Sequence, residues 1–395
     1  MRRRSMRDEG RTQVPLKIGL LTHSVNPRGG VVHTIELAHA LHDAGHEVTV
    51  MAPAVAGQDF FRPVCCATEL VPVAGAPRSM VEMVGQRIEA YVAHLAALLQ
   101  HSRFDVLHCH DGIGGNALAT LRARGLIQGF VRTVHHLDDF DDAQLMCWQQ
   151  RSVTEASQVF CLSRQWHEVL AKQHGIDAAQ VWNGVDTRRF TPVPEAGDAA
   201  LALRLGIRTE APVLLAVGGV EERKNTLRLL QAFIRLRATR PGLQLVVAGG
   251  ASLLDHAPYA REFAALVRAA ELPMGPRQPL LITGPLADAD MPGLYRLADA
   301  VAMPSVREGF GLVVLEALAS GVPVVVSRIA PFTEYLDESD CSWAEPFDPE
   351  SIARAIAAAL DSASPDRIAA SSERLAHRFS WATSAERHVA LYRRH

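Results

Sequence analysis

The chain has few cysteines and no long hydrophobic run. Its six cysteines, among 395 residues, show neither the paired spacing of a zinc site nor the pattern of a disulfide framework. We therefore expect reduced thiols and a cytoplasmic location. The apolar runs are far shorter than a membrane span, and no apolar segment follows the basic N-terminus, as a secretory signal would require. A disordered tail over residues 1–15 and no transmembrane segment are predicted.

An excess of charge of either sign is also missing. The formal net charge is −3 and charged residues make up 21% of the chain, so nothing argues for nucleic acid as a partner. Apolar residues reach 48%, which is ample for packing. Because a chain of this length exceeds the size of one typical core, two domains are expected.

What the sequence does contain is a regular alternation of short apolar runs and helical stretches. The first unit is a strand over 17–22, a helix over 31–44 and a second strand over 46–51. Such a βαβ unit predicts a parallel sheet with right-handed crossovers. Further strands are expected at 104–109, 130–135, 158–162, 213–217, 243–248, 279–283, 299–303 and 322–326, and further helices at 79–100, 225–239, 256–271, 288–298, 311–320 and within 349–395.

Prolines near 192–194 separate two rounds of this alternation. The fold class predicted is therefore α/β, with two doubly wound parallel-sheet domains that face each other across a cleft.

The segment Glu308-Gly-Phe-Gly-Leu-Val-Val-Leu-Glu316 places two carboxylates on either side of a helix start. Gly309 and Gly311 let the backbone turn sharply and approach a ligand, and the helix N-terminus favours an anion. Glu316 has apolar neighbours, so its carboxylate needs hydrogen-bond donors such as a ribose diol. The alternative for Glu316 taken alone is a solvated surface residue. The whole segment suits a sugar, a diphosphate and a ribose in a row.

Polar residues also follow several strands of the first domain. Gly29 and Gly30 open a helix where phosphate could approach the backbone, with a structural turn as the alternative. Their spacing is not the dinucleotide fingerprint, which disfavours a dehydrogenase. His135 ends the strand near 130–135, and His108 and His110 end another. These histidines show no zinc-binding spacing, so no metal is expected.

In the second domain, Gly218, Gly219, Arg223 and Lys224 follow the strand 213–217. A guanidinium and an ammonium group together can neutralise a diphosphate leaving group. The alternative is a solvated charged loop at a helix start.

These residues, in this order, resemble the retaining glycosyltransferases of family 4, which have the two-Rossmann GT-B fold. The resemblance covers nearly the whole chain and rests on Gly29-Gly30, Thr133-Val-His135, Cys161-Leu-Ser163, Asn183-Gly-Val-Asp186, Arg223-Lys224-Asn225, the motif from Glu308 to Glu316, and Trp381. It implies an acceptor-side domain of residues 16–188 with the last helix, 380–395, packed back on it. Residues 189–379 would form the donor-binding domain.

The resemblance further implies transfer of a hexosyl group from a UDP- or GDP-sugar to a hydroxyl acceptor, with retention of configuration and without metal or other cofactor. The catalytic residues implied are His135, Lys224, Arg223 and Glu308. The donor-binding residues implied are Gly29, Gly30, Gly219, Arg223, Lys224, Glu308, Gly309, Phe310, Gly311, Leu312 and Glu316.

Individual roles follow from the same resemblance. Glu316 would bind the ribose, Glu308 would face the hexose, and Lys224 would hold the diphosphate. Many relatives carry an arginine at the position of Gly219, and Arg223 is the candidate replacement.

Several alternatives stay open. A nucleotide-sugar epimerase or hydrolase of the same architecture would need acid and base groups beside the sugar carbon, which the region of His135 and Asp138 could supply. A non-catalytic nucleotide-binding module is the third reading. The acceptor is open among a small molecule, a glycan and a lipid-linked sugar, and the last would bring the protein to a membrane surface.

Overall fold

A computed structural model describes residues 14–75, 77–250, 256–362 and 364–394. The first part of the chain forms β1 (Lys17–Leu21), α1 (Gly29–Asp43), β2 (Glu47–Ala54), β3 (Ala67–Pro72), α2 (Met80–Leu98), β4 (Val106–Cys109), α3 (Gly112–Ala123), β5 (Val131–Val134), α4 (Ala143–Thr154), β6 (Gln158–Cys161), α5 (Arg164–His174) and β7 (Ala179–Gln180).

The second part contains α6 (Ala196–Leu205), β8 (Val213–Val217), α7 (Thr226–Arg237), β9 (Gln244–Ala248), α8 (Ala257–Ala269), β10 (Leu280–Gly284), the 3₁₀ turn η1 (Asp288–Asp290), α9 (Met291–Arg296), β11 (Ala300–Met303), α10 (Leu312–Ala319), β12 (Val324–Ser327), the 3₁₀ turn η2 (Phe332–Glu334) and β13 (Cys341–Ala344). Three helices close the chain: α11 (Pro349–Ser362), α12 (Pro365–Arg378) and α13 (Trp381–Tyr392).

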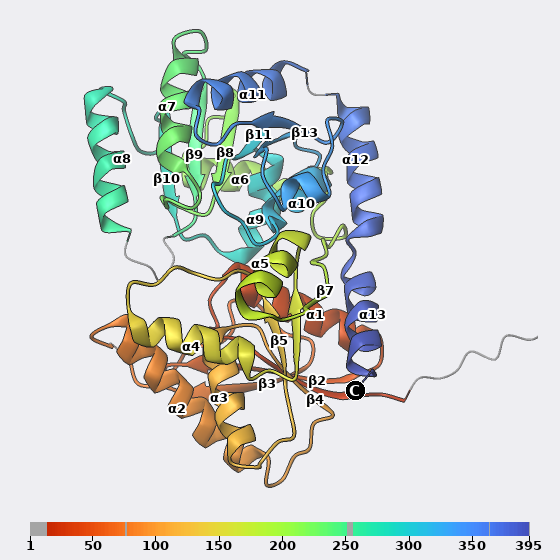
Figure 1. Ribbon diagram of the computed structural model, residues 1–395. Helices are drawn as coiled ribbons and strands as arrows, with labels where there is room; N and C mark the ends of the chain where they lie inside the picture. The colour runs from red at the N-terminus through yellow and green to blue at the C-terminus, as the bar shows by residue number, and fades with distance from the viewer. Residues whose placement is uncertain (1–13, 76, 251–255, 363, 395) are drawn as a thin grey trace, which may run out of the picture.

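Two parallel sheets organise the molecule, one in each tier of Figure 1. The first has seven strands in the order β3-β2-β1-β4-β5-β6-β7, and the second has six in the order β10-β9-β8-β11-β12-β13. In each sheet the order reverses beside the first strand, which is the doubly wound arrangement. The predicted fold class is confirmed. We call the seven-stranded sheet with its helices the first domain and the six-stranded sheet with its helices the second domain.

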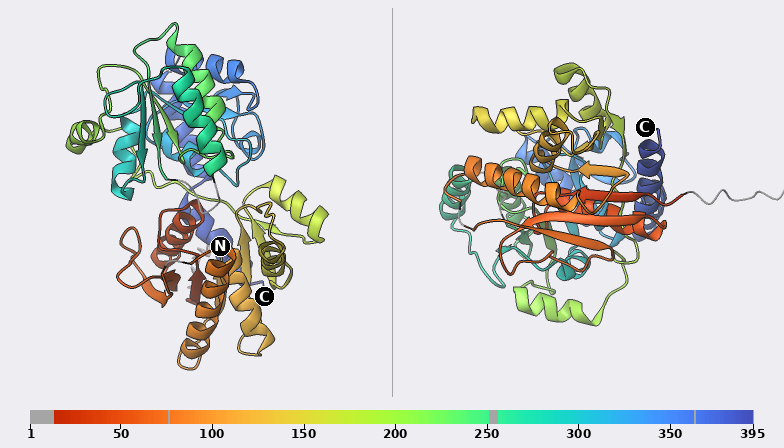
Figure 2. Two further views of the ribbon diagram at one scale, coloured as in Figure 1. Left: turned by 90° about the vertical axis from the view of Figure 1, so that its left-hand side faces the viewer. Right: turned by 90° about the horizontal axis from the view of Figure 1, so that it is seen from below.

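The last two helices join the two tiers along one edge, and Figure 2 shows the same two-tier arrangement from the side. Although α13 follows the second domain in sequence, it packs against α1 of the first. Tyr392 Oη of α13 lies 2.7 Å from His108 Nδ1, and Arg393 donates to the carbonyl oxygen of Val14 at 2.5 Å.

Local sequence explains where three helices of the first domain begin. Ser79, Asp111 and Ser163 each accept a hydrogen bond from a backbone N–H in the first turn of α2, α3 and α5. Such side-chain caps satisfy donors that the helix itself leaves unpaired. The strands between them are short and buried: all four residues of β5 are buried, as expected for a parallel sheet covered on both faces.

Most predicted elements are present, with differences at their ends. The strand at 213–217 is confirmed as β8, whereas β2 runs three residues past the predicted end at 51. The predicted helix 288–298 is a 3₁₀ turn followed by the short helix α9. Elements that the pattern did not predict are β3, α3, α4, α5, β7, α6 and β13. Residues 1–13 of the predicted tail, and residue 395 of the predicted last helix, lie outside the described residues.

Two expectations from composition concern the cysteines and membrane-spanning helices. All six cysteines are free, and Cys109, Cys161 and Cys341 are buried. Among the described residues, no helix has the length and apolar character needed to cross a membrane.

Candidate active site between the two domains

The loop before α10 touches the end of β5 across the domain boundary. A methyl group on Gly309 would lie 2.3 Å from the backbone oxygen of His135, so only glycine permits this approach. Trp166 of α5 donates its indole N–H to the backbone oxygen of Glu308 at 3.2 Å. The motif thus reaches the first domain at the rim where β5 and β6 end.

Charged side chains hold the two domains together around this point. Glu334 accepts hydrogen bonds from the backbone N–H groups of Arg164 and Gln165, at 2.7 and 2.9 Å. A carboxylate at the start of α5 is also favoured by the helix dipole. On the opposite side of the cleft, Arg62 pairs with Glu36 at 2.7 Å and with Asp288 of the second domain at 3.5 Å.

Glu308 is the centre of a compact ionic cluster. One of its carboxylate oxygens lies 2.7 Å from Lys224 Nζ and 2.8 Å from Arg223 Nη1, and it accepts a hydrogen bond from Ser305 Oγ at 3.1 Å. Glu308 is only 6% exposed. A buried carboxylate is tolerated here because two cations and a hydroxyl compensate its charge.

The electrostatics of the cluster keep Glu308 ionised at neutral pH. Burial would raise the pKa of Glu308, but Lys224 and Arg223 outweigh it and lower that pKa to about 2. Burial lowers the pKa of Lys224, and the charge of Glu308 opposes this effect. The sequence predicted Glu308 as a residue that faces the hexose and Lys224 and Arg223 as cations for the diphosphate; direct contact among the three was not predicted.

Gly219 follows the end of β8, next to Gly218, whose added Cβ would lie 2.7 Å from Lys224 Cε. The N–H of Gly219 donates to the backbone oxygen of Ala248 at 3.1 Å. The guanidinium beside Glu308 comes from Arg223, four residues further along the chain.

The N-terminus of α10 follows the cluster directly. Gly311 precedes the helix with a φ of 95°, and no side chain caps the first turn. An added Cβ at Gly311 would meet the ring of Phe332 at 2.5 Å. Both the left-handed backbone and the crowding require glycine here. The first backbone N–H groups of α10 thus have no side-chain acceptor and can serve an anion.

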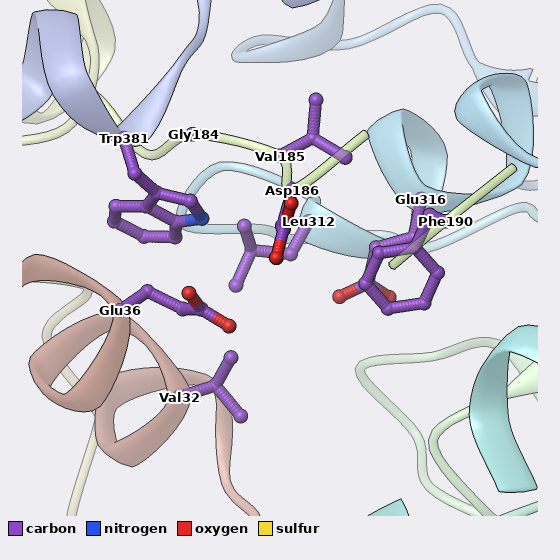
Figure 3. Close-up of a pocket in the computed structure, with 9 residues that line it drawn as sticks. All are labelled: Val32, Glu36, Gly184, Val185, Asp186, Phe190, Leu312, Glu316 and Trp381. Carbon is purple, nitrogen blue, oxygen red and sulfur yellow. The ribbon is translucent and has the colours of Figure 1, made fainter. Parts of the chain in front are cut away.

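Glu316, on the next turn of α10, faces a small pocket between the domains. Tyr295 Oη donates to its Oε2 at 2.7 Å. Burial raises the pKa of Glu316, and the bond from Tyr295 opposes that shift. Figure 3 shows that the carboxylates of Glu36, Asp186 and Glu316 turn toward the same space. The complete lining is Val32, Glu36, Gly184, Val185, Asp186, Phe190, Leu312, Glu316 and Trp381.

Phe310 contributes to the core. Its side chain is 4% exposed and stacks on Tyr335 with 5.1 Å between ring centroids. Tyr335 also donates its hydroxyl to the backbone oxygen of Phe310 at 2.8 Å. Any contribution of Phe310 to donor binding would therefore come from its N–H group.

On the first-domain side, His135 lies beside the start of α1. Gly29 and Gly30 are the first two residues of that helix, and an added Cβ on Gly30 would be 3.6 Å from the His135 ring. His135 Nε2 is 3.4 Å from His110 Nδ1, and the His33 ring lies 4.7 Å from the His135 ring. Burial is the main cause that lowers the pKa of His135 well below its usual value. His135 is thus a neutral imidazole at physiological pH.

Five residues of this region were not predicted as part of a site: Ser305, Tyr295, Trp166, Glu36 and Asp186. Ser305 could have been noticed, because it stands three residues before Glu308 and a hydroxyl there can reach the carboxylate. Tyr295 and Trp166 carried no signal, since their partners are 21 and 142 residues away in sequence.

Two facing Rossmann-like domains with a cationic cluster between them define the layout of a GT-B glycosyltransferase, and comparisons with known proteins agree. A family model described as glycosyl transferases group 1 matches residues 202–375, and one described as glycosyltransferase family 4 matches residues 27–189. The chain belongs to this family of glycosyltransferases.

Among curated relatives, the D-inositol 3-phosphate glycosyltransferase of Xylanimonas cellulosilytica is 30% identical over 392 residues, covering 92% of this chain and 91% of that protein. The phosphatidyl-myo-inositol mannosyltransferase of Mycolicibacterium smegmatis is 27% identical, covering 95% and 93%.

Solved structures show the same fold. A sucrose-phosphate synthase from Thermosynechococcus elongatus superposes with a TM-score of 0.76 at 22% identity, covering 95% of this chain and 98% of that one. Anabaena HepE in complex with UDP and glucose superposes with a TM-score of 0.77 at 18% identity, covering 95% and 99%.

Proposed function

We propose that this glycosyltransferase moves a hexosyl group from a UDP- or GDP-sugar to a hydroxyl acceptor, with retention of anomeric configuration and without a metal ion. The observation that carries the proposal is the cluster of Lys224 and Arg223 around the buried Glu308, set against the uncapped start of α10 and opposite His135. Two cations and a helix N-terminus suit the charge that develops on a departing nucleoside diphosphate.

In this scheme Glu308 positions the two cationic side chains. Its carboxylate fixes the ends of both Lys224 and Arg223, within 2.7 and 2.8 Å. Since Glu308 stays ionised at neutral pH, it holds both side chains in place before the donor arrives. A preorganised pair of this kind needs no rearrangement during the reaction.

Glu316 is the proposed ribose ligand. One of its oxygens is held by Tyr295, while the carboxylate faces the pocket with Leu312. Burial favours hydrogen-bond donors at that carboxylate, and two hydroxyls of a ribose supply them.

The first domain would hold the acceptor and enclose the transferred sugar. His135 is neutral and next to Gly309, so it can exchange a hydrogen bond with a sugar hydroxyl without adding charge. Retention is consistent with attack of the acceptor on the face that the diphosphate leaves, a donor phosphate oxygen taking the proton.

The experiment is an NMR assay of chelator-treated protein with UDP- and GDP-sugars, run with and without acceptor. D-inositol 3-phosphate and phosphatidylinositol are the first acceptors to try, because relatives carry those names. We expect a new glycoside whose anomeric proton keeps the donor's configuration. An inverted product would overturn retention. Conversion of the donor alone, without transfer to any acceptor, would favour the epimerase or hydrolase.

A further inference from the structure

Three histidines of the first domain gather around the end of β5, and only His135 has a part in the proposed transfer. His33 comes from α1, while His110 and His135 directly follow β4 and β5. Their ring centroids are 4.7, 4.9 and 5.6 Å apart. One ring nitrogen from each lies within 4.8 Å of the other two.

These separations match those of three imidazoles on one tetrahedral metal ion. With zinc–nitrogen bonds of about 2.1 Å, two ligand nitrogens are roughly 3.3 Å apart and their ring centroids roughly 5 Å apart. His110 Nδ1 and His135 Nε2 are already 3.4 Å apart, which is long for a hydrogen bond. The third ligand nitrogen, on His33, must move by no more than about 1.5 Å, and rotation of the ring can supply that shift.

The unpaired Nε2 of His33 points to the same conclusion. It is buried without a hydrogen-bond partner among the described residues, and His33 is 0% exposed. Buried polar atoms of this kind usually have a partner. His33 Nδ1 lies 2.5 Å from Asn183 Oδ1, which fixes the ring and leaves Nε2 as a lone-pair donor. Outer partners of this type orient metal-binding histidines.

Two neighbouring histidines are not part of this group. Both ring nitrogens of His108 are engaged, with Tyr392 and Thr133 at 2.7 Å each. His388 Nε2 is also buried without a hydrogen-bond partner among the described residues, but its ring centroid is 6.0 Å from that of His33, farther than the separation of any two of the three rings. His135 is partly exposed, so an ion can enter from the cleft.

We propose that His33, His110 and His135 form a binding site for a zinc ion, which inhibits the enzyme by occupying the ring nitrogen of His135. The inhibition rests on the proposed function, whereas the binding of zinc does not. Imidazole nitrogens are preferred ligands of zinc, and three protein ligands leave a fourth position for water. No step of the transfer would use this ion.

The test is zinc titration of untagged, chelator-treated protein by calorimetry, with His33→Gln as the variant and His388→Gln as the control. Both residues are 0% exposed and lie on helices, so the two substitutions perturb packing to a similar degree. We expect one zinc per chain in the wild type and in His388→Gln, and binding more than about 100-fold weaker in His33→Gln. Equal affinity of His33→Gln and wild type would overturn the proposal, as would a wild-type Kd weaker than about 1 mM.

A second measurement covers the case in which His33→Gln does not fold. Co²⁺ replaces zinc in the wild type, and its visible spectrum reports the geometry. A strong tetrahedral spectrum is expected, and a weak octahedral spectrum would contradict the site. In the transfer assay, zinc should inhibit the wild type and not His33→Gln. Zinc binding without any transfer activity would instead refute the proposed function and leave the metal site standing.

Discussion

The two sides of the cleft differ in how they carry buried polar groups. On the second-domain side, Glu308, Lys224 and Arg223 are all charged and pair directly with one another. On the first-domain side, His33 and His135 are neutral, because burial lowers their pKa values and no carboxylate contacts either ring in the described structure. The difference indicates that charge is concentrated where a diphosphate would leave, while the part of the opposite wall formed by His33 and His135 remains neutral.

This contrast has an energetic basis. A buried charge is stable only when paired and hydrogen bonded, as Glu308 is by two cations and Ser305. A buried histidine without such a partner gives up its proton instead. The second domain therefore keeps its buried carboxylate charged and paired, whereas the buried histidines of the first domain stay neutral.

The largest effect is expected from removing a charge on the second-domain side. Lys224→Ala should lower kcat by ~10²–10³, the loss typical of a group that stabilises transition-state charge. Steady-state kinetics would measure it. Lys172→Ala is the control, because that lysine side chain is 79% exposed on α5. Wild-type turnover in Lys224→Ala would remove the charged cluster from the mechanism.

Moving the loop at Gly309 away from His135 should lower activity nearly as much. In Gly309→Ala the new methyl group would lie 2.3 Å from the oxygen of His135, so the loop must retreat. We expect kcat/KM to fall by about 10²-fold, since small displacements of reacting groups are costly. Gly242→Ala, where an added Cβ meets nothing within 4 Å, provides the comparison. Equal activity of the two variants would contradict the tight approach.

Donor affinity should depend on Glu316 of the second domain. Glu316→Ala removes a buried acceptor and should weaken nucleotide-sugar binding about 10–100-fold, the value of one charged hydrogen bond. Calorimetry would measure it, with the exposed Glu350→Ala as control. Unchanged affinity would refute the ribose role.

Buried neutral histidines should cause most of the loss of stability in mild acid. The pKa of His33 is lowered to about 4 and that of His388 to about 3, mainly by burial. Because the unfolded histidines bind protons first, stability is fully present above pH 6.5 and falls as the pH drops toward these values. Glu308 acts in the other range: its contribution is present above pH 4.5 and is lost as the pH falls through about 2.

Urea unfolding of chelator-treated protein between pH 7 and pH 4 would test this. We expect His388→Gln to reduce the slope of unfolding free energy against pH, by an amount corresponding to about one proton. An unchanged slope would show that His388 does not titrate in this range.

The smallest effect is expected from an exposed ion pair at the edge of the domain interface. Arg307 pairs with Asp139 across the domains at 2.7 Å, but the Asp139 side chain is 91% exposed. Arg307→Ala should change the free energy of unfolding by less than about 1 kcal/mol, since water screens exposed pairs. Thermal unfolding would measure it, and a larger loss would mean that charge on the rim also holds the domains.

The sequence predicted the architecture because the strands are short apolar runs, each followed by amphipathic helices. It missed β3 and β13, which are less completely buried than the predicted strands. In β13 only the two end residues are buried. Helices α3, α4 and α5 were missed too, although their capping residues Asp111, Asp142 and Ser163 carry a local signal.

Within the site, contacts between residues close in sequence were within reach of prediction, and contacts set by tertiary folding were not. Arg223, Lys224 and Glu308 were each predicted as site residues, with separate roles toward the diphosphate and the hexose, whereas their direct contact is a feature of the tertiary structure. The approach of Gly309 to His135, 174 residues apart, depends on how the two domains meet. No pattern along the chain encodes that geometry.

The most direct test of the account is a thermal-shift and calorimetric comparison of UDP, GDP and their sugars with the wild type, Lys224→Ala and Glu316→Ala. We predict that one nucleotide series raises the Tm of the wild type, as a ligand of the folded state must. Both substitutions should weaken that binding. Equal binding by all three proteins, or no binding of any nucleotide by the wild type, would contradict the donor site assigned to the second domain.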